Sequence, residues 1–93
     1  MEYQVIVLPT AEKDLDLLSP TIRERVVRRL RWLSQNATEV IHHALKGMPE
    51  DLVGLCKLRV GDYRILYWKK DSKQEIQVFR VRHRSEVYKK LDL

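Results

Sequence analysis

Six positively charged side chains recur in the last third of the chain, among residues that favour β-strands. They are Lys57, Arg59, Arg64, Arg80, Arg82 and Arg84. Successive side chains of a strand point to opposite faces, so a spacing of two residues places Lys57 and Arg59 on the same face. The same rule places Arg80 with Arg82. If the strands that carry these residues are neighbours, the positive charges on one sheet face repel one another. An anion such as a polyphosphate chain would relieve this repulsion by binding there.

The elements that must hold these cations are three predicted antiparallel strands. They are expected at residues 55–60, 63–70 and 75–82, separated by turns at residues 61–62 and 71–73. The positions expected on the core face are Cys56, Leu58, Val60, Tyr63, Ile65, Tyr67, Phe79 and Val81. Leu66 and Trp68 share the cationic face by the same alternation. Trp68 there either stacks on a nucleic-acid base or is covered by the tail of the chain or by a partner.

The first half of the chain predicts a strand and a pair of helices. Residues 3–8 read as a strand that Pro9 stops, and Thr10 is the expected cap of a short helix. Ser19-Pro20 is a favourable helix start, with serine as the cap and proline in the first turn. Apolar residues follow at helical spacing, with arginines over the remaining surface, at positions Ile22, Val26, Leu30 and Leu33. The two helices are therefore expected to form an antiparallel hairpin.

The remaining segments carry weaker signals. Residues 37–45 fit either a helical turn or an irregular loop, residues 46–49 a turn, and residues 85–91 a final short helix. The expected order is strand, helical hairpin, three-stranded antiparallel meander and C-terminal short helix. This order predicts an α+β fold in a small single domain that spans residues 1–93.

The composition fits a basic protein that binds an anionic partner. The chain has 93 residues, a net charge of +5 and a pI near 9.6, with ten arginines, whose planar guanidinium suits bidentate phosphate contacts. A basic surface also suits a membrane or an acidic protein, so charge alone leaves these open. The single cysteine, Cys56, excludes a disulfide within the chain, which fits a cytoplasmic location. The sequence predicts neither a spanning helix nor a signal peptide, hence no membrane partner.

Two segments carry a resemblance to a known family: KLRVGDYR at residues 57–64 and RHRSEVY at residues 82–88. LKGMP at residues 45–49 and the basic helix at residues 19–31 support it. With them the chain resembles a RelE-type toxin of the RelE/ParE superfamily. The resemblance implies a type II toxin that cuts mRNA in the ribosomal A site without a metal or other cofactor. It also implies a RelB-like antitoxin, the 70S ribosome and mRNA as partners, and operator DNA bound through the antitoxin.

The resemblance also assigns roles to residues of this chain. The family's catalytic positions fall on Lys57, Arg64, Arg82 and Tyr88, and the candidate nucleic-acid contacts are Lys46, Arg59, Arg80, Arg84, Arg25 and Arg28. The chain departs from the family where well-known members have a second lysine two residues before Lys57, because Leu55 occupies that position. His83 and Arg84 are the candidates to make up the missing charge.

The implied reaction is attack by a ribose 2′-hydroxyl on the adjacent phosphate, leaving a 2′,3′-cyclic phosphate and a 5′-hydroxyl. Arg64 and Arg82 suit neutralisation of the phosphorane, because a guanidinium matches two phosphate oxygens. On spacing alone they fit solvated surface arginines equally well. Lys57 and Tyr88 are the candidates for proton transfer, and a phenol becomes a base where nearby cations favour its anion. For Tyr88 the competing reading is a packing residue that anchors the tail.

Histidines add one further candidate. A histidine side chain suits acid–base work, which makes His83 a candidate, but this residue also fits a plain position at the start of the tail helix. His42 and His43 have no cysteines or suitably spaced carboxylates around them, so the sequence predicts plain surface residues and no metal site.

Two alternatives to the nuclease remain open. A ParE-like inhibitor of DNA gyrase has the same fold but has no need of the set Lys57, Arg64, Arg82 and Tyr88. The second alternative is a degenerate toxin that retains only antitoxin binding and operator repression. Leu55 favours this alternative, because it replaces the second lysine of well-known family members.

Overall fold

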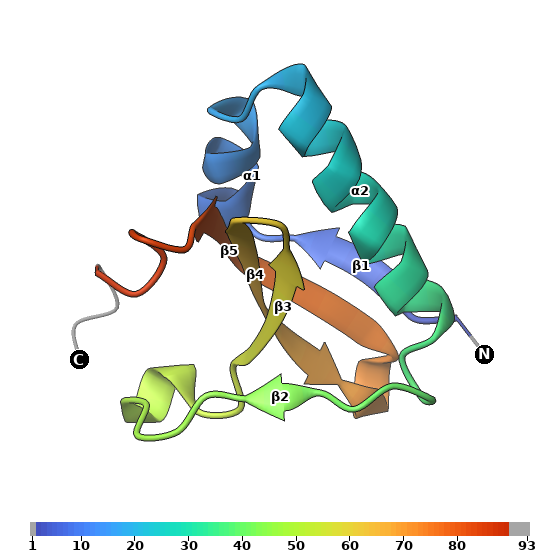
Figure 1. Ribbon diagram of the computed structural model, residues 1–93. Helices are drawn as coiled ribbons and strands as arrows, with labels where there is room; N and C mark the ends of the chain where they lie inside the picture. Colours follow the sequence, from blue (N-terminus) through green and yellow to red (C-terminus); the bar gives the residue numbers. More distant parts are fainter. Residues whose placement is uncertain (1, 90–93) are drawn as a thin grey trace.

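The computed structural model describes residues 2–89, and Figure 1 shows a twisted sheet with two helices on one face. The elements are β1 Gln4–Val7, α1 Pro9–Asp16, α2 Pro20–Gln35, β2 His43–Ala44, η1 Glu50–Leu52, β3 Cys56–Val60, β4 Tyr63–Lys70, η2 Asp71–Lys73 and β5 Glu75–His83. The predicted α+β fold, its helical hairpin and its three-stranded meander are confirmed. In this part of the chain, no helix combines the length and the apolar composition that a membrane crossing requires.

The sheet has the strand order β1-β5-β4-β3-β2. β1 runs parallel to β5, with Gln4 opposite Glu75 and Val7 opposite Val78, and the other pairs are antiparallel. The last strand therefore lies inside the sheet, between the first strand and β4. The pairing of β1 with β5 therefore joins the first strand of the chain to the meander.

The helical hairpin follows from local signals in the sequence. Ser19 caps α2, with its Oγ accepting from the backbone N–H of Ile22, and Pro20 is the first helical residue. The predicted apolar stripe packs on the sheet, with Val26, Leu30 and Leu33 buried. Arg23 closes the hairpin, because its guanidinium donates to main-chain carbonyls at the end of α1 and in the connecting turn.

The predicted cap of α1 is wrong. The helix begins at Pro9, whose fixed φ suits a first turn, and Leu8 is the residue that precedes it. Thr10 therefore lies inside the helix, and its hydroxyl donates to the carbonyl oxygen of Phe79 at 2.6 Å.

That carbonyl marks a β-bulge which changes the predicted alternation of β5. Leu66 lies opposite Arg80 and Tyr67 opposite Val78, so Phe79 is the extra residue on β5. As a result Val81 packs in the core beneath the helices, whereas Phe79 packs on the opposite face of the sheet. The expectation that Phe79 and Val81 share one face is therefore wrong.

The second face of the sheet carries an apolar cluster and is not uniformly cationic. Leu55 and Leu66 are fully buried there, with Val87 from the tail and Leu52 from η1. The irregular segment before β3, which contains β2 and η1, covers this part of the sheet (Figure 1). The cations therefore occupy only the part of this face that the apolar cluster leaves free.

The predicted final helix is not formed over the residues that the structure describes. Residues 84–89 are successive turns, in which the N–H groups of Glu86 and Val87 donate to the His83 carbonyl. The path of these turns is set by the packing of the segment on the sheet, where the buried side chain of Val87 anchors it. The predicted helix also includes residues 90 and 91, which lie outside the described residues.

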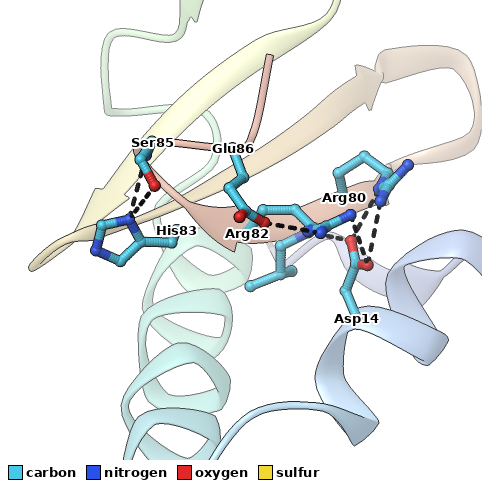
Figure 2. A network of polar contacts seen from close by, with 7 residues as sticks. Asp14, Arg80, Arg82, His83, Ser85 and Glu86 are labelled. Carbon is cyan, nitrogen blue, oxygen red and sulfur yellow. Dashed lines mark hydrogen bonds and ion pairs between the residues drawn. The ribbon is translucent and has the colours of Figure 1, made fainter. Parts of the chain in front are cut away.

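A buried carboxylate joins α1 to β5. Asp14, 5% exposed, accepts from Arg80 through Nε at 2.8 Å and Nη2 at 3.3 Å, and from the backbone N–H of Val81 at 3.0 Å. Arg82 Nη1 lies 4.0 Å from the same carboxylate (Figure 2). The neighbouring arginines of β5 are thus anchored to the helical hairpin.

Replacing Asp14 with asparagine is expected to lower the free energy of unfolding by roughly 3 kcal/mol, because it leaves the half-buried Arg80 without its counter-charge. Urea denaturation measures the change. Asp16→Asn is the matched control on the same helix, since Asp16 is exposed and only its backbone carbonyl is bonded. Equal stability of the two variants would mean that the ion pair does not hold α1 to β5.

At the other end of the sheet, the Tyr3 hydroxyl donates to Asp71 at 2.7 Å, and Lys69 lies 3.1 Å from the same carboxylate. The hydrogen bond from Tyr3 and the charge of Lys69 lower the pKa of Asp71. A lowered folded-state pKa stabilises the fold above the unfolded-state value of about 4, and this contribution is lost as the pH falls through the folded-state value. Tyr3→Phe is expected to raise the pKa of Asp71, measured by carboxyl-carbon NMR, whereas Tyr63→Phe leaves it unchanged.

Candidate functional site

A row of three arginines crosses three strands of the sheet near the β3–β4 turn. Arg59 lies directly opposite Arg64, and Arg64 lies directly opposite Arg82, on β3, β4 and β5 respectively. Like charges at directly opposed positions destabilise a sheet. Within the described part of the chain, neither Arg59 nor Lys57 has an acidic partner. An anion with several negative oxygens would relieve this repulsion.

The row opens into a groove of about 930 Å³ that lies between β3, α2 and the tail. Three of the predicted catalytic residues line it together: Lys57, Arg64 and Tyr88. Two of the predicted nucleic-acid contacts, Arg59 and Arg84, line it as well. The structure therefore brings these five side chains to one site.

The turn between β3 and β4 fixes the position of Arg64. Its Nη1 donates to the carbonyl oxygens of Gly61 and Tyr63, each at 2.9 Å. Gly61 has φ of +57°, a conformation that other residues adopt with strain. The guanidinium is thus held by backbone carbonyl groups rather than by an acidic side chain.

The tail brings Tyr88 into the groove. Val87 inserts into the apolar half of the face, and Glu86 accepts from Arg82 Nη2 at 3.1 Å (Figure 2). Tyr88 then follows the buried anchor and is 37% exposed. The tail thus folds back over the sheet through turns rather than through a helix.

Arg82 and Arg80 are engaged in ion pairs on the flank of the row. Arg82 contacts Glu86 and Asp14, and Arg80 contacts Asp14. Neither lines the groove. Arg82 remains the neighbour of Arg64 in the sheet, so its predicted phosphate contact requires Glu86 to release its guanidinium.

His83 lies at the start of the tail turns. Its Nδ1 accepts from the backbone N–H of Ser85 at 3.2 Å and lies 2.9 Å from the Ser85 hydroxyl (Figure 2). Its ring packs edge-on against the ring of Tyr63, with the two ring centroids 5.4 Å apart. Because Nδ1 is occupied, only Nε2 is available for the acid–base role predicted for this residue.

The remaining predicted contacts lie apart from the groove. Lys46 is exposed in the segment that precedes β3, and Arg25 and Arg28 line an adjoining hollow on α2. Trp68 is covered, since it packs on Phe79 at 5.2 Å and donates to the Val53 carbonyl. Trp68 is thus covered by Val53 and Phe79, whereas the two covers that were expected were the tail and a partner.

Leu55, at the position of the missing lysine, is fully buried against Leu66. A lysine there would have to leave the apolar cluster to reach the groove. Of the two candidates for the missing charge, Arg84 lines the groove, while His83 is bonded to Ser85.

Sequence reasoning missed the interaction between His42 and Tyr67. His42 was expected at the surface, but it is half-buried, and its Nε2 donates to the Ala37 carbonyl while its Nδ1 accepts from the Tyr67 hydroxyl, both at 2.7 Å. Burial, with a smaller contribution from Cys56, raises the pKa of Tyr67 well above its ordinary value. Tyr67 therefore acts as a hydrogen-bond donor that fixes the groove wall, and no local sequence pattern indicated this.

Two further groups bear on the chemistry. Burial raises the pKa of Cys56, and Lys69 opposes this shift, so the thiol is not activated. Among residues 2–89, no three side chains of the metal-ligating types lie close enough together to hold an ion.

The five-stranded sheet of this order, with a helical hairpin on one face, makes the chain a small α+β domain with a cationic groove beside the β3 edge. The family model described as ParE toxin of the type II toxin–antitoxin system parDE matches residues 5–88. The chain belongs to the RelE/ParE superfamily of type II toxins.

Individual relatives agree with this assignment. The chain is 33% identical to toxin RelG of Mycobacterium tuberculosis over 91 residues, which cover 97% of this chain and all of the relative. Its fold matches the toxin–antitoxin complex RelBE2 of the same organism, with a TM-score of 0.76, 32% identity and coverage of 92% of this chain and 95% of the other. A free RelE variant from E. coli matches with a TM-score of 0.75 and 26% identity, over 98% of this chain and 95% of that one.

The opposed arginines are expected to reduce stability in the absence of an anion. Arg59→Gln should raise the free energy of unfolding by roughly 0.5 kcal/mol at low ionic strength, because it removes one like-charge pair from the sheet. The gain should shrink with added salt, which screens the repulsion. Chemical denaturation at two salt concentrations tests this, with Arg31→Gln on the exposed face of α2 as the control. No gain at low salt would show that the row carries no repulsion.

Proposed function

We propose that this chain is a ribosome-dependent mRNA endonuclease that cuts in the A site by metal-free attack of a 2′-hydroxyl. The observation that carries the proposal is the meeting of Lys57, Arg64 and Tyr88 in one groove, beside a row of opposed arginines. These are residue types that phosphate-ester cleavage requires: a fixed cation and two groups able to move protons.

Each residue has a defined task in the proposed reaction. The 2′-oxygen forms a bond to the adjacent phosphorus as the bond to the 5′-oxygen breaks, giving a cyclic phosphate and a 5′-hydroxyl. Arg64, held by the β3–β4 turn, neutralises charge on the phosphorane. Tyr88 and Lys57, which line the same groove, exchange protons with the attacking and leaving oxygens.

The form of the groove supports dependence on the ribosome. It lies on an open face of the domain, and two of its residues, Lys57 and Arg59, are exposed. An open site holds a flexible RNA poorly in the in-line geometry, whereas an RNA fixed in the A site already has its path set. Orientation of this kind supplies several kcal/mol of barrier reduction.

A toxin of this type requires a partner that silences it in the cytoplasm. The M. tuberculosis relative RelBE2 is a toxin–antitoxin complex, and we infer a RelB-like antitoxin for this chain as well. The net charge of +5 suits an acidic segment of such a partner, and operator DNA would be bound through the antitoxin.

Gyrase inhibition is the competing function, because the matching family model is that of ParE toxins. A gyrase inhibitor makes no use of a tyrosine and a lysine beside a fixed arginine. Supercoiling assays with purified gyrase separate the two activities, and gyrase inhibition without any RNA cut would refute the nuclease.

Tyr88→Phe is expected to slow cleavage of mRNA on programmed ribosomes by roughly 10²-fold or more, because the hydroxyl is lost while the ring still packs. Arg64→Ala should reduce the rate by a similar or larger factor and leave ribosome affinity nearly unchanged, since its main contact forms in the transition state. Single-turnover rates with mapping of the new mRNA 5′ ends measure both effects.

The matched control is Tyr63→Phe, which removes a hydroxyl from a tyrosine on β4 outside the groove, and it should cut normally. His83→Gln should lose less activity than Tyr88→Phe. Normal cutting by Tyr88→Phe with loss of activity in His83→Gln would transfer the proton-transfer role to the histidine. Rapid cutting of naked RNA would contradict the dependence on the ribosome.

A further inference from the structure

The proposed cleavage site accounts for only one of two adjoining hollows. A second hollow of about 460 Å³ lies on α2 and is lined by Arg25, Arg28, Arg29, Trp32 and Val60. Arg29 and Trp32 also line the groove that contains the cleavage site. The two hollows are therefore continuous across these side chains.

The incomplete pairing of β3 leaves this passage open. β2 pairs only with Cys56 and Lys57, so within the described residues no strand covers the edge of β3 from Leu58 to Val60. The groove passes over this bare edge, from the sheet face that carries Lys57 to the face that packs on α2.

An aromatic ring lies at the junction of the hollows. Trp32 is 37% exposed on α2, and the guanidinium carbon of Arg29 lies 4.1 Å from its ring centroid. An indole stacked on an arginine gives a flat, electron-rich surface with a cation beside it. Flat aromatic surfaces beside cations are typical of sites that stack nucleic-acid bases.

The charges around the ring all have one sign. The residues that line the two hollows include seven cations and, among the described residues, no aspartate or glutamate. Arg25 is placed over the β3–β4 turn, where its Nη2 lies 2.9 Å from the position that a Cβ on Gly61 would take. Arg28 pairs with Glu24 at 3.4 Å, but both side chains are mostly exposed, and exposed pairs of this kind yield readily to a phosphate.

We propose that the second hollow binds single-stranded RNA, with Trp32 stacking on an unpaired base and Arg25, Arg28 and Arg29 contacting the flanking phosphates. The RNA continues over the β3 edge from the strand held at Lys57 and Arg64, and in this respect the inference rests on the proposed function. An acidic protein segment is the competing occupant. RNA fits better because the bare edge offers only three residues for strand addition, whereas the exposed indole and its arginines match a base with two phosphates.

Fluorescence anisotropy with a labelled eight-nucleotide RNA, 2′-O-methylated throughout so that it cannot be cut, tests binding at this hollow. Trp32→Ala should weaken binding by about tenfold, and Trp32→Phe should restore most of the affinity because it retains an aromatic face. Arg28→Gln should reduce the slope of log affinity against log salt by about 0.7, as expected for one single-strand phosphate contact. Leu17→Ala is the control, since Leu17 is an 81% exposed apolar residue that lines neither hollow.

Thermal melting establishes that each variant is folded, and Trp32 fluorescence in a Trp68→Phe background gives a second readout that RNA should quench. Unchanged RNA affinity in Trp32→Ala would overturn the proposal, as would quenching by an acidic peptide but not by RNA. Ribosomal cleavage is measured separately on the same variants. Cleavage with no Trp32 effect on binding would refute this subsite alone, whereas RNA binding at Trp32 without any cleavage would refute the proposed nuclease and leave the subsite standing.

Discussion

The arrangement of the site depends on the buried carboxylate of Asp14. It accepts from two groups of Arg80 and from the backbone of Val81, just after the bulge of β5. The contact fixes α1 against the strand and sets the register in which Arg82 comes opposite Arg64. A buried acceptor must be fully bonded, so the position of α1 leaves β5 little freedom. The geometry of the cationic row is thereby imposed from the opposite side of the sheet.

The domain compensates some of its cations and leaves others unbalanced. Asp14, Glu86 and Asp62 lie on the flank and contact the arginines at positions 80, 82 and 84. Lys57 and Arg59 have no such partner among the described residues, and Arg64 is held by carbonyl groups. Repulsion is thus concentrated where a phosphate would sit. Stability is lower than it would be with neutral residues, which is the usual relation between a preorganised charged site and its scaffold.

Features that depend on neighbouring residues in the sequence were predictable. The Ser19-Pro20 start of α2, its apolar stripe, and the limits of β3 and β4 follow from capping, periodicity and turn residues. The alternation also placed Lys57, Arg59 and Arg64 on one face correctly.

Features set by distant contacts were not predictable. The bulge at Phe79, whose carbonyl accepts from Thr10 69 residues away, reverses the face of one side chain. Trp68 carried no local sign that the Val53 carbonyl would cover it. The tail forms turns instead of a helix because one apolar anchor, Val87, determines its path. No sequence pattern singled out Trp32, because the hollow beside it depends on the open edge of β3.

The position of β5 between β1 and β4 has a consequence for synthesis. The parallel pairing of residues 4–7 with residues 75–78 joins segments about seventy positions apart, and contacts of this kind form late in folding. The first strand can pair with its neighbour only after residues 75–78 have left the exit tunnel of the ribosome. The arginine row is completed by the same strand, at Arg82. Neither the closed sheet nor the complete arginine row can therefore form before β5 has been synthesised and has left the ribosome.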